Sequence, residues 1–148
     1  WDSPDFPTAQ QIMQKSNETL RGCGLSGQKV SYLRDLSQKL IDDPHFLSDV
    51  DALDDEAVVE RLTSVRGLGR WSVEMFLMFH LGRLDVWPVG DLGVRKAVQL
   101  LHGLSDLPPP KQMQQLGSPY APYRSVATWY LWRLLELSAE DLAALPLS

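Results

Sequence analysis

The sequence predicts an all-α protein, and three observations lead to this prediction. In most segments apolar residues recur every three or four positions, and no segment alternates apolar and polar residues as a half-buried strand would. The breaks between segments carry helix-capping residues, glycine or proline. About eight helices joined by short loops account for the 148 residues. At this length one domain, spanning residues 1–148, is expected.

The first half of the chain is expected to form four helices. They cover residues 9–15, a single turn from residue 17 to about 22, a longer segment that ends before Pro44, and a segment that begins near residue 55. The longer helix carries an apolar stripe. The predicted N-caps are Thr8, Asn17, Ser26 and Asp54.

The second half begins with a helix over 71–81, which is apolar almost all round and is therefore expected to be buried, with Gly82 as its C-terminal stop. The segment 84–90 is extended or looped, because Pro88 disfavours helix at the preceding residue. Further helices are expected from Asp91 to about 102, as a short segment around Met113, and over about 123–137. Ser138 then caps a terminal turn.

Composition excludes several classes of protein. No apolar run approaches the roughly 20 residues that cross a bilayer, and the first ten residues lack a signal peptide pattern, so an intracellular protein without membrane contact is expected. One cysteine and three scattered histidines exclude a disulfide framework, a zinc site and a cysteine-bound iron–sulfur cluster. Residues 35–60 hold nine acids and one base, whereas residues 61–96 hold six bases and three acids. Pairing between acidic and basic helices is the ordinary explanation.

Two glycines flank one leucine in LTSVRGLGRWSVEMF, residues 62–76. A helix, this short break and a second helix predict a hairpin at about 55–82, because glycine accepts backbone angles closed to other residues. Amides of Gly67 and Gly69, together with those at the start of the second helix, are expected to bind a phosphate, aided by Arg66 and Arg70. An ordinary interhelical turn is the alternative.

The hairpin residues VRGLGRWSVEMF, the later WPVGDLGVR and the ending PYRSVATWYLW resemble, in this order, the helix-hairpin-helix DNA glycosylase superfamily. The ending is similar to the branch called 3-methyladenine DNA glycosylase II. The resemblance runs from about Phe6 to Leu137. It implies base-excision repair of double-stranded DNA, with hydrolysis of the N-glycosidic bond of alkylated purines such as 3-methyladenine and 7-methylguanine after base flipping.

The resemblance also implies site residues. Asp91 matches the aspartate that stabilises the cationic sugar, and a helix N-terminus favours its charged form. Trp71 and Trp132 match tryptophans of the base pocket, and Met75 stands where the best-known member has tyrosine. Trp71 also occupies the position at which bifunctional relatives carry a Schiff-base lysine, so an enzyme without lyase activity is implied. Trp129 is expected in the core, whereas Trp87 and Tyr130 receive no firm assignment.

No cofactor is required for this chemistry. Family hairpins commonly hold a monovalent cation, and the matching backbone carbonyls belong to Thr63, Val65 and Leu68, so a structural Na⁺ or K⁺ is an expectation. Arg124 lies where the family has arginine. It either contacts the surroundings of Asp91 or pairs with an acid inside the fold, and the second is favoured.

Relatives carry further helices ahead of the segment that begins at Phe6, and these pack against the last long helix. We therefore expect an N-terminally incomplete domain, a monomer, with an apolar face exposed on helix 123–137. Two alternatives stay open. One is a non-catalytic helix-hairpin-helix module that holds DNA by its backbone, and the other is an all-α protein-interaction domain.

Overall fold

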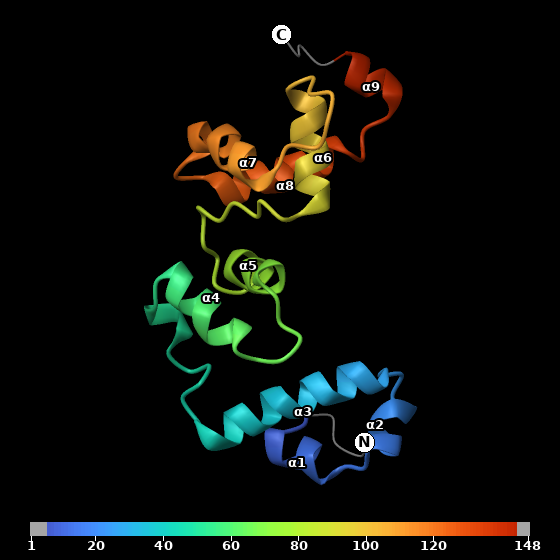
Figure 1. Cartoon of the computed structure of the whole chain (residues 1–148), viewed down its shortest axis with the longest axis vertical. Helices are drawn as coiled ribbons and strands as arrows, with labels where there is room; N and C mark the ends of the chain where they lie inside the picture. Colours follow the sequence, from blue (N-terminus) through green and yellow to red (C-terminus); the bar gives the residue numbers. More distant parts are fainter. Residues whose placement is uncertain (1–5, 145–148) are drawn as a thin grey trace. The chain divides into compact units, whose positions relative to one another are not determined.

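The computed structural model describes residues 6–144, and every regular element in that range is helical. This confirms the predicted all-α class. By its internal contacts the chain divides at Val73 into two compact units, residues 1–73 and 74–148. Each unit is built separately below (Figure 1). The expectation of one domain over residues 1–148 stays a prediction.

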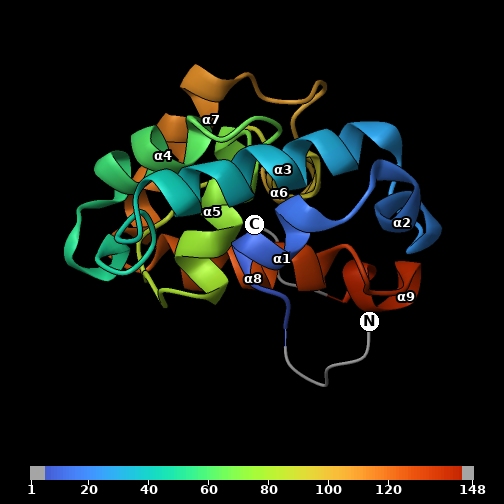
Figure 2. The ribbon, with the colours of Figure 1, turned by 90° about the horizontal axis from the view of Figure 1, so that it is seen from below.

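The first unit begins with two short helices that pack on a long one (Figures 1 and 2). These are α1 (Ala9–Gln14), α2 (Asn17–Gly22) and α3 (Gly27–Asp42). Their shared core consists of Ile12, Leu20 and Val30. Thr8 and Ser26 cap α1 and α3 as predicted, but the cap of α2 is Ser16, whose hydroxyl accepts from the amide of Thr19, so the predicted Asn17 cap was wrong by one residue.

The rest of the first unit contains the 3-10 turn η1 (Val50–Ala52) and α4 (Asp55–Thr63), which Asp54 caps as predicted. Residues of the acidic stretch 35–60 form ion pairs here with residues of the basic stretch 61–96. This is the pairing that the ordinary explanation of the charge pattern predicts. Arg61 bonds Asp49 at 2.5 Å, and Arg70 forms an ion pair with Glu56.

The helix α5 (Arg70–Phe79) contains the division between the units. The helix ends at Phe79, and Gly82, with φ +65°, ends the turn that follows it, as predicted for the C-terminal stop. The expectation of a helix buried all round was wrong. Its buried residues are Val73, Glu74 and Leu77, whereas Trp71 and Phe79 are 52% and 65% exposed.

The second unit packs three helices around one core (Figure 1). They are α6 (Leu92–Leu101), α7 (Pro110–Gly117), which the 3-10 turn η2 (Ser118–Tyr120) follows, and α8 (Arg124–Leu134). The core comprises Trp87, Val94, Ala97, Val98, Met113 and Leu131. Pro110 opens α7 at a position where its missing amide costs nothing.

The helix α8 ends three residues before the predicted Leu137. The amides of Leu135, Glu136 and Leu137 bond carbonyls three residues back, so the chain tightens from α-helix into 3-10 turns. Ser138 then caps α9 (Ala139–Ala143) through the amide of Asp141, as predicted. None of the described helices is long and apolar enough to cross a membrane.

One face of α8 carries the expected apolar surface. A groove of about 630 Å³ runs along it. Its lining includes Leu101, Tyr120, Tyr123, Val126, Tyr130 and Leu134. Trp129, on the same helix, is 49% exposed, so its predicted core position was wrong. Its ring packs edge-on against Tyr130, and the Arg133 guanidinium lies 5.9 Å from its centroid.

Candidate active site

Asp91 is the N-cap of α6, and the residues before it place it there. The Pro88 carbonyl accepts a hydrogen bond from the Asp91 amide at 2.9 Å, which closes a turn immediately ahead of the helix. Asp91 Oδ1 then accepts from the amide of Val94 at 2.7 Å. The residue is only 8% exposed. The sequence prediction that α6 begins at this aspartate is therefore confirmed.

Trp132 reaches the same carboxylate from α8. Its indole N–H donates to Asp91 Oδ1 over 3.0 Å. Gly93 leaves room for this approach, because a Cβ there would lie 3.1 Å from both Asp91 Oδ1 and Trp132 Cδ1. Two donors on one oxygen fix the orientation of the carboxylate. Thus the structure brings together Asp91 and Trp132, two of the predicted site residues.

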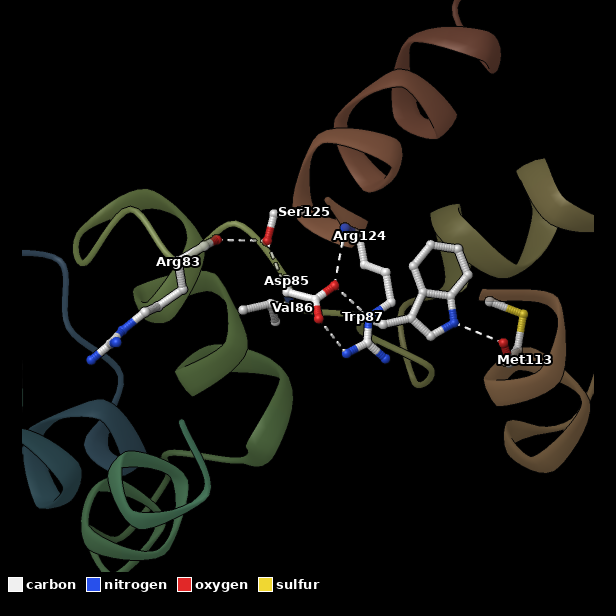
Figure 3. Close-up of polar contacts among 7 residues, drawn as sticks. All are labelled: Arg83, Asp85, Val86, Trp87, Met113, Arg124 and Ser125. Atoms are coloured by element: carbon white, nitrogen blue, oxygen red, sulfur yellow. Dashed lines mark hydrogen bonds and ion pairs between the residues drawn. The ribbon is translucent and has the colours of Figure 1, made fainter. Parts of the chain in front are cut away.

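The segment that delivers Asp91 is tied to the start of α8 (Figure 3). Arg124 donates to both carboxylate oxygens of Asp85, at 2.6 and 2.8 Å. This side-chain hydrogen bond lowers the pKa of Asp85 and raises that of Arg124. Of the two alternatives for Arg124, pairing with an acid inside the fold is the one observed.

Ser125 and Trp87 hold the same segment at two further points (Figure 3). The Ser125 hydroxyl donates to the Arg83 carbonyl at 2.7 Å and accepts from the Val86 amide at 2.9 Å. The buried Trp87 indole donates to the Met113 carbonyl at 2.8 Å. Gly117 makes room for it, because a Cβ there would lie 2.4 Å from the indole. Trp87 is thus a core residue that anchors the segment.

In the first unit, the glycine break forms the predicted hairpin turn between α4 and α5. Gly67 has φ +89°, in the left-handed region that favours glycine. A Cβ on Gly67 would lie 2.1 Å from the Tyr32 ring of α3, so this glycine is also required for packing. A Cβ on Gly69 would meet nothing within 4 Å, and Gly69 is exposed. The open backbone predicted for the turn is therefore found at Gly69.

Two acids contact the hairpin groups that were expected to meet DNA. The amide of Arg66 donates to Asp35 Oδ2 on α3 at 2.8 Å. The guanidinium of Arg70 makes two hydrogen bonds with Glu56, one of them at 3.0 Å, and lowers the pKa of that carboxyl. Both arginines remain exposed, and a phosphate would compete with these carboxylates.

The remaining predicted positions lie on or beside the hairpin. Trp71 is half exposed at the start of α5, and Met75 lies half-buried one turn later. The Val65 carbonyl accepts from the amide of Leu68 at 3.1 Å. A carbonyl oxygen has two lone pairs, so this bond leaves Val65 able to coordinate a cation together with the carbonyls of Thr63 and Leu68.

Sequence reasoning missed Gly93, Asp35 and Phe79. Gly93 could have been found, since a glycine two residues after a helix-capping aspartate often marks a close approach. Phe79 follows Met75 by four residues, which puts it on nearly the same face of α5. No local sequence pattern indicated Asp35, because its contact with Arg66 joins residues 31 positions apart.

Known proteins that are similar to this chain have names that agree with one another. The chain is 34% identical over 137 residues to the alkylbase DNA glycosidase-like protein mag2 of Schizosaccharomyces pombe, covering 92% of this chain and 64% of the relative. It is 36% identical over 134 residues to DNA-3-methyladenine glycosylase 1 of the same yeast, covering 90% and 59%. The chain therefore spans about three fifths of the length of these curated relatives.

A solved structure of the Schizosaccharomyces pombe 3-methyladenine DNA glycosylase in complex with abasic DNA superimposes with a TM-score of 0.80 at 35% identity. The match covers 90% of this chain and 66% of that one. Residues 2–122 match the family described as HhH-GPD superfamily base excision DNA repair protein. Together with the predicted motifs, which occur in the expected order, these matches show that the chain belongs to the HhH-GPD superfamily of base excision DNA repair proteins.

Proposed function

We propose that the protein is a DNA glycosylase that hydrolyses the N-glycosidic bond of alkylated purines, such as 3-methyladenine and 7-methylguanine, in double-stranded DNA. The observation that supports this most directly is the Asp91 carboxylate, which is buried and held through one oxygen by Val94 and Trp132. Membership of the repair superfamily and the names of the relatives support the same reaction.

The chemistry requires a fixed negative charge beside the sugar. As the bond between C1′ and the base nitrogen breaks, the base leaves with the electron pair and positive charge builds on the sugar. Asp91 stabilises that cation and orients a water molecule, which adds to C1′ and releases a proton.

The base is rotated out of the duplex before this step. By their match to the family motifs, Trp71, Met75 and Trp132 are the residues that we assign to contact with the extruded base. Alkylation at N3 or N7 gives the purine a positive charge, so the base leaves without protonation and is attracted to the faces of the tryptophans.

The reaction ends with an abasic site and an intact strand. An indole at position 71 cannot form a Schiff base with the sugar, so the enzyme has no lyase activity. The hairpin around Gly67 and Gly69 binds the phosphate backbone with Arg66 and Arg70. The carbonyls of Thr63, Val65 and Leu68 would hold a Na⁺ or K⁺, which would supply positive charge beside a phosphate. The protein acts as a monomer, and a DNA substrate places it inside the cell.

The test is incubation of the protein with duplexes that each carry one defined lesion, followed by identification of the released base by mass spectrometry. We expect free 3-methyladenine and 7-methylguanine, and strand cleavage only after later heating in alkali. A protein that binds these duplexes and releases no base would instead be the non-catalytic helix-hairpin-helix module. Immediate strand cleavage would refute the absence of lyase activity.

A further inference from the structure

We propose that Asp35 is a positioning residue for the hairpin, because it holds the peptide group between Val65 and Arg66 so that the Val65 carbonyl is directed to bind a monovalent cation. This inference rests on the proposed function and extends it to α3, whose residues the motifs do not include. It is carried by the hydrogen bond from the Arg66 amide to Asp35 Oδ2, at 2.8 Å, and by the bond at the other end of the same peptide group.

Both ends of this peptide group are bonded within the first unit. The Arg66 N–H donates to Asp35, and the Val65 carbonyl accepts from the Leu68 amide at 3.1 Å. The peptide bond is trans, so its N–H and its C=O point in opposite directions. The carboxylate on one side of the peptide therefore fixes the direction of the carbonyl on the other side, and that carbonyl points into the turn.

A second residue of α3 supports the next position of the turn. The Tyr32 ring occupies the space beside Gly67, where a Cβ would lie 2.1 Å from it. Tyr32 precedes Asp35 by three residues, so the two lie on one face of α3. The Tyr32 hydroxyl in turn accepts a hydrogen bond from the side-chain amide of Gln28. One face of α3 thus supports two consecutive residues of the turn (Figure 1).

Two roles are available to a carboxylate on a hairpin amide. As a competitor it keeps a phosphate from the N–H, and as a support it holds the peptide while a phosphate binds elsewhere on the turn. The geometry favours the second role. The bonded N–H belongs to Arg66, whereas the open and exposed backbone lies three residues later, at Gly69.

The carboxylate also acts on the carbonyl oxygen through the peptide group. A charged acceptor on the N–H polarises the amide and increases the negative charge on its oxygen. Backbone carbonyls bind monovalent cations by replacing water of hydration, so a more negative oxygen binds more strongly. The Val65 oxygen retains a lone pair beside its bond from Leu68. Asp35 therefore supports the cation site without touching the cation.

The experiment compares the wild type with Asp35→Ala and Asp35→Asn in binding to a duplex with an abasic site. Affinities are measured at one ionic strength in potassium chloride and in tetramethylammonium chloride, whose cation is too large for a set of three carbonyls. Asp35→Ala should bind about five- to tenfold more weakly in potassium chloride, although it removes a negative charge that repels DNA. Asp35→Asn keeps an acceptor oxygen and should stay within about twofold of the wild type.

The change of salt isolates the contribution of the cation. In tetramethylammonium chloride the wild type should weaken to about the level of Asp35→Ala, and Asp35→Ala should change less than about twofold. Asp42→Ala is the matched control, because Asp42 is also an acid of α3 but bonds Gln38 of its own helix. It removes the same charge and should retain the affinity and the salt response of the wild type. Thermal melts verify that every variant is folded at the assay temperature.

Tighter binding by Asp35→Ala would show that the carboxylate competes with phosphate and would overturn the proposal. So would a loss that Asp35→Asn shares in full, a loss of the same size in both salts, or equal binding of the wild type in the two salts. A wild type that releases no base would refute the proposed function, while this binding comparison would still decide the role of Asp35.

Discussion

The indole nitrogen of Trp132 lies 3.0 Å from Asp91 Oδ1 and donates a hydrogen bond to it. In the proposed mechanism Trp132 therefore has two roles, since besides contacting the base it holds the carboxylate in one orientation. Trp132→Phe keeps an aromatic ring and removes the donor. We expect kcat to fall about 10- to 100-fold, because hydrogen bonds to charged groups are the stronger ones.

Binding separates this positioning role from a simple packing role. The affinity of Trp132→Phe for duplex DNA with an abasic site should stay within about twofold of the wild type, because no base stacks there. Single-turnover base release and a binding titration on the same preparation measure both quantities. An unchanged rate of release would show that the hydrogen bond is not needed.

Asp85 and Arg124 predict a pH dependence of stability. The hydrogen bond from Arg124 lowers the pKa of the Asp85 carboxyl below the unfolded value of 3.8. A lowered pKa in the folded state means that the pair stabilises the protein above about pH 4 and that this contribution is lost as pH falls through the lower, folded value. Asp85→Asn should therefore melt at a lower temperature than the wild type at pH 7.

The difference between the two melting temperatures should shrink progressively below pH 4, because the Asp85 carboxyl takes up a proton in the unfolded state first and in the folded state only below its lowered pKa. Thermal melts of both proteins between pH 3 and pH 7, recorded at one salt concentration, provide the measurement. A difference that stays constant over this range would contradict the electrostatic role of the pair.

Glu56 competes with DNA for Arg70 in our account. Glu56→Gln removes the charge that pairs with Arg70, so the arginine becomes available to a phosphate. We expect tighter binding to every duplex sequence, together with a slope of log K against log salt that is steeper by about one. Asp49→Asn, which frees Arg61 away from the glycine turn, is the matched control and should leave the slope unchanged. Weaker binding by Glu56→Gln would mean that the ion pair supports the hairpin.

The two hairpin glycines should respond differently to substitution. Gly67→Ala meets both a positive φ and the Tyr32 ring, so it should lower the melting temperature strongly. Gly69→Val has open space around its Cβ, so the protein should fold and bind every duplex more weakly. Thermal melts and a DNA titration for both variants test this. Full DNA affinity in a folded Gly69→Val protein would remove Gly69 from the interface.

Helix order was predictable because it depends on local signals. The caps at Thr8, Ser26, Asp54 and Asp91 and the stop at Gly82 follow from short-range hydrogen bonding and backbone angles. The capping role of Asp91 was predictable for the same reason, whereas its catalytic role comes from its match to the family motif and stays a proposal. The misplaced cap of α2 shows the usual uncertainty of one residue where Ser16 and Asn17 are adjacent.

Tertiary contacts were not predictable in this way. The bonds of Asp35 to the Arg66 amide and of Ser125 to the Val86 amide join segments 31 and 39 residues apart, and no local pattern encodes them. Exposure was also misjudged. Trp71, Phe79 and Trp129 look like core residues from their neighbours in the sequence, but all three are substantially exposed. In this chain, aromatic residues on apolar helices therefore lie at the surface as well as in the core.

The measurement that tests the account most directly is base release by Asp91→Asn. The amide has nearly the shape of the carboxylate but lacks its charge. We predict that single-turnover release of 7-methylguanine falls by at least about 100-fold, while affinity for abasic duplex DNA and the melting temperature change little. Release by Asp91→Asn at the wild-type rate would contradict the central claim that this carboxylate stabilises the sugar cation.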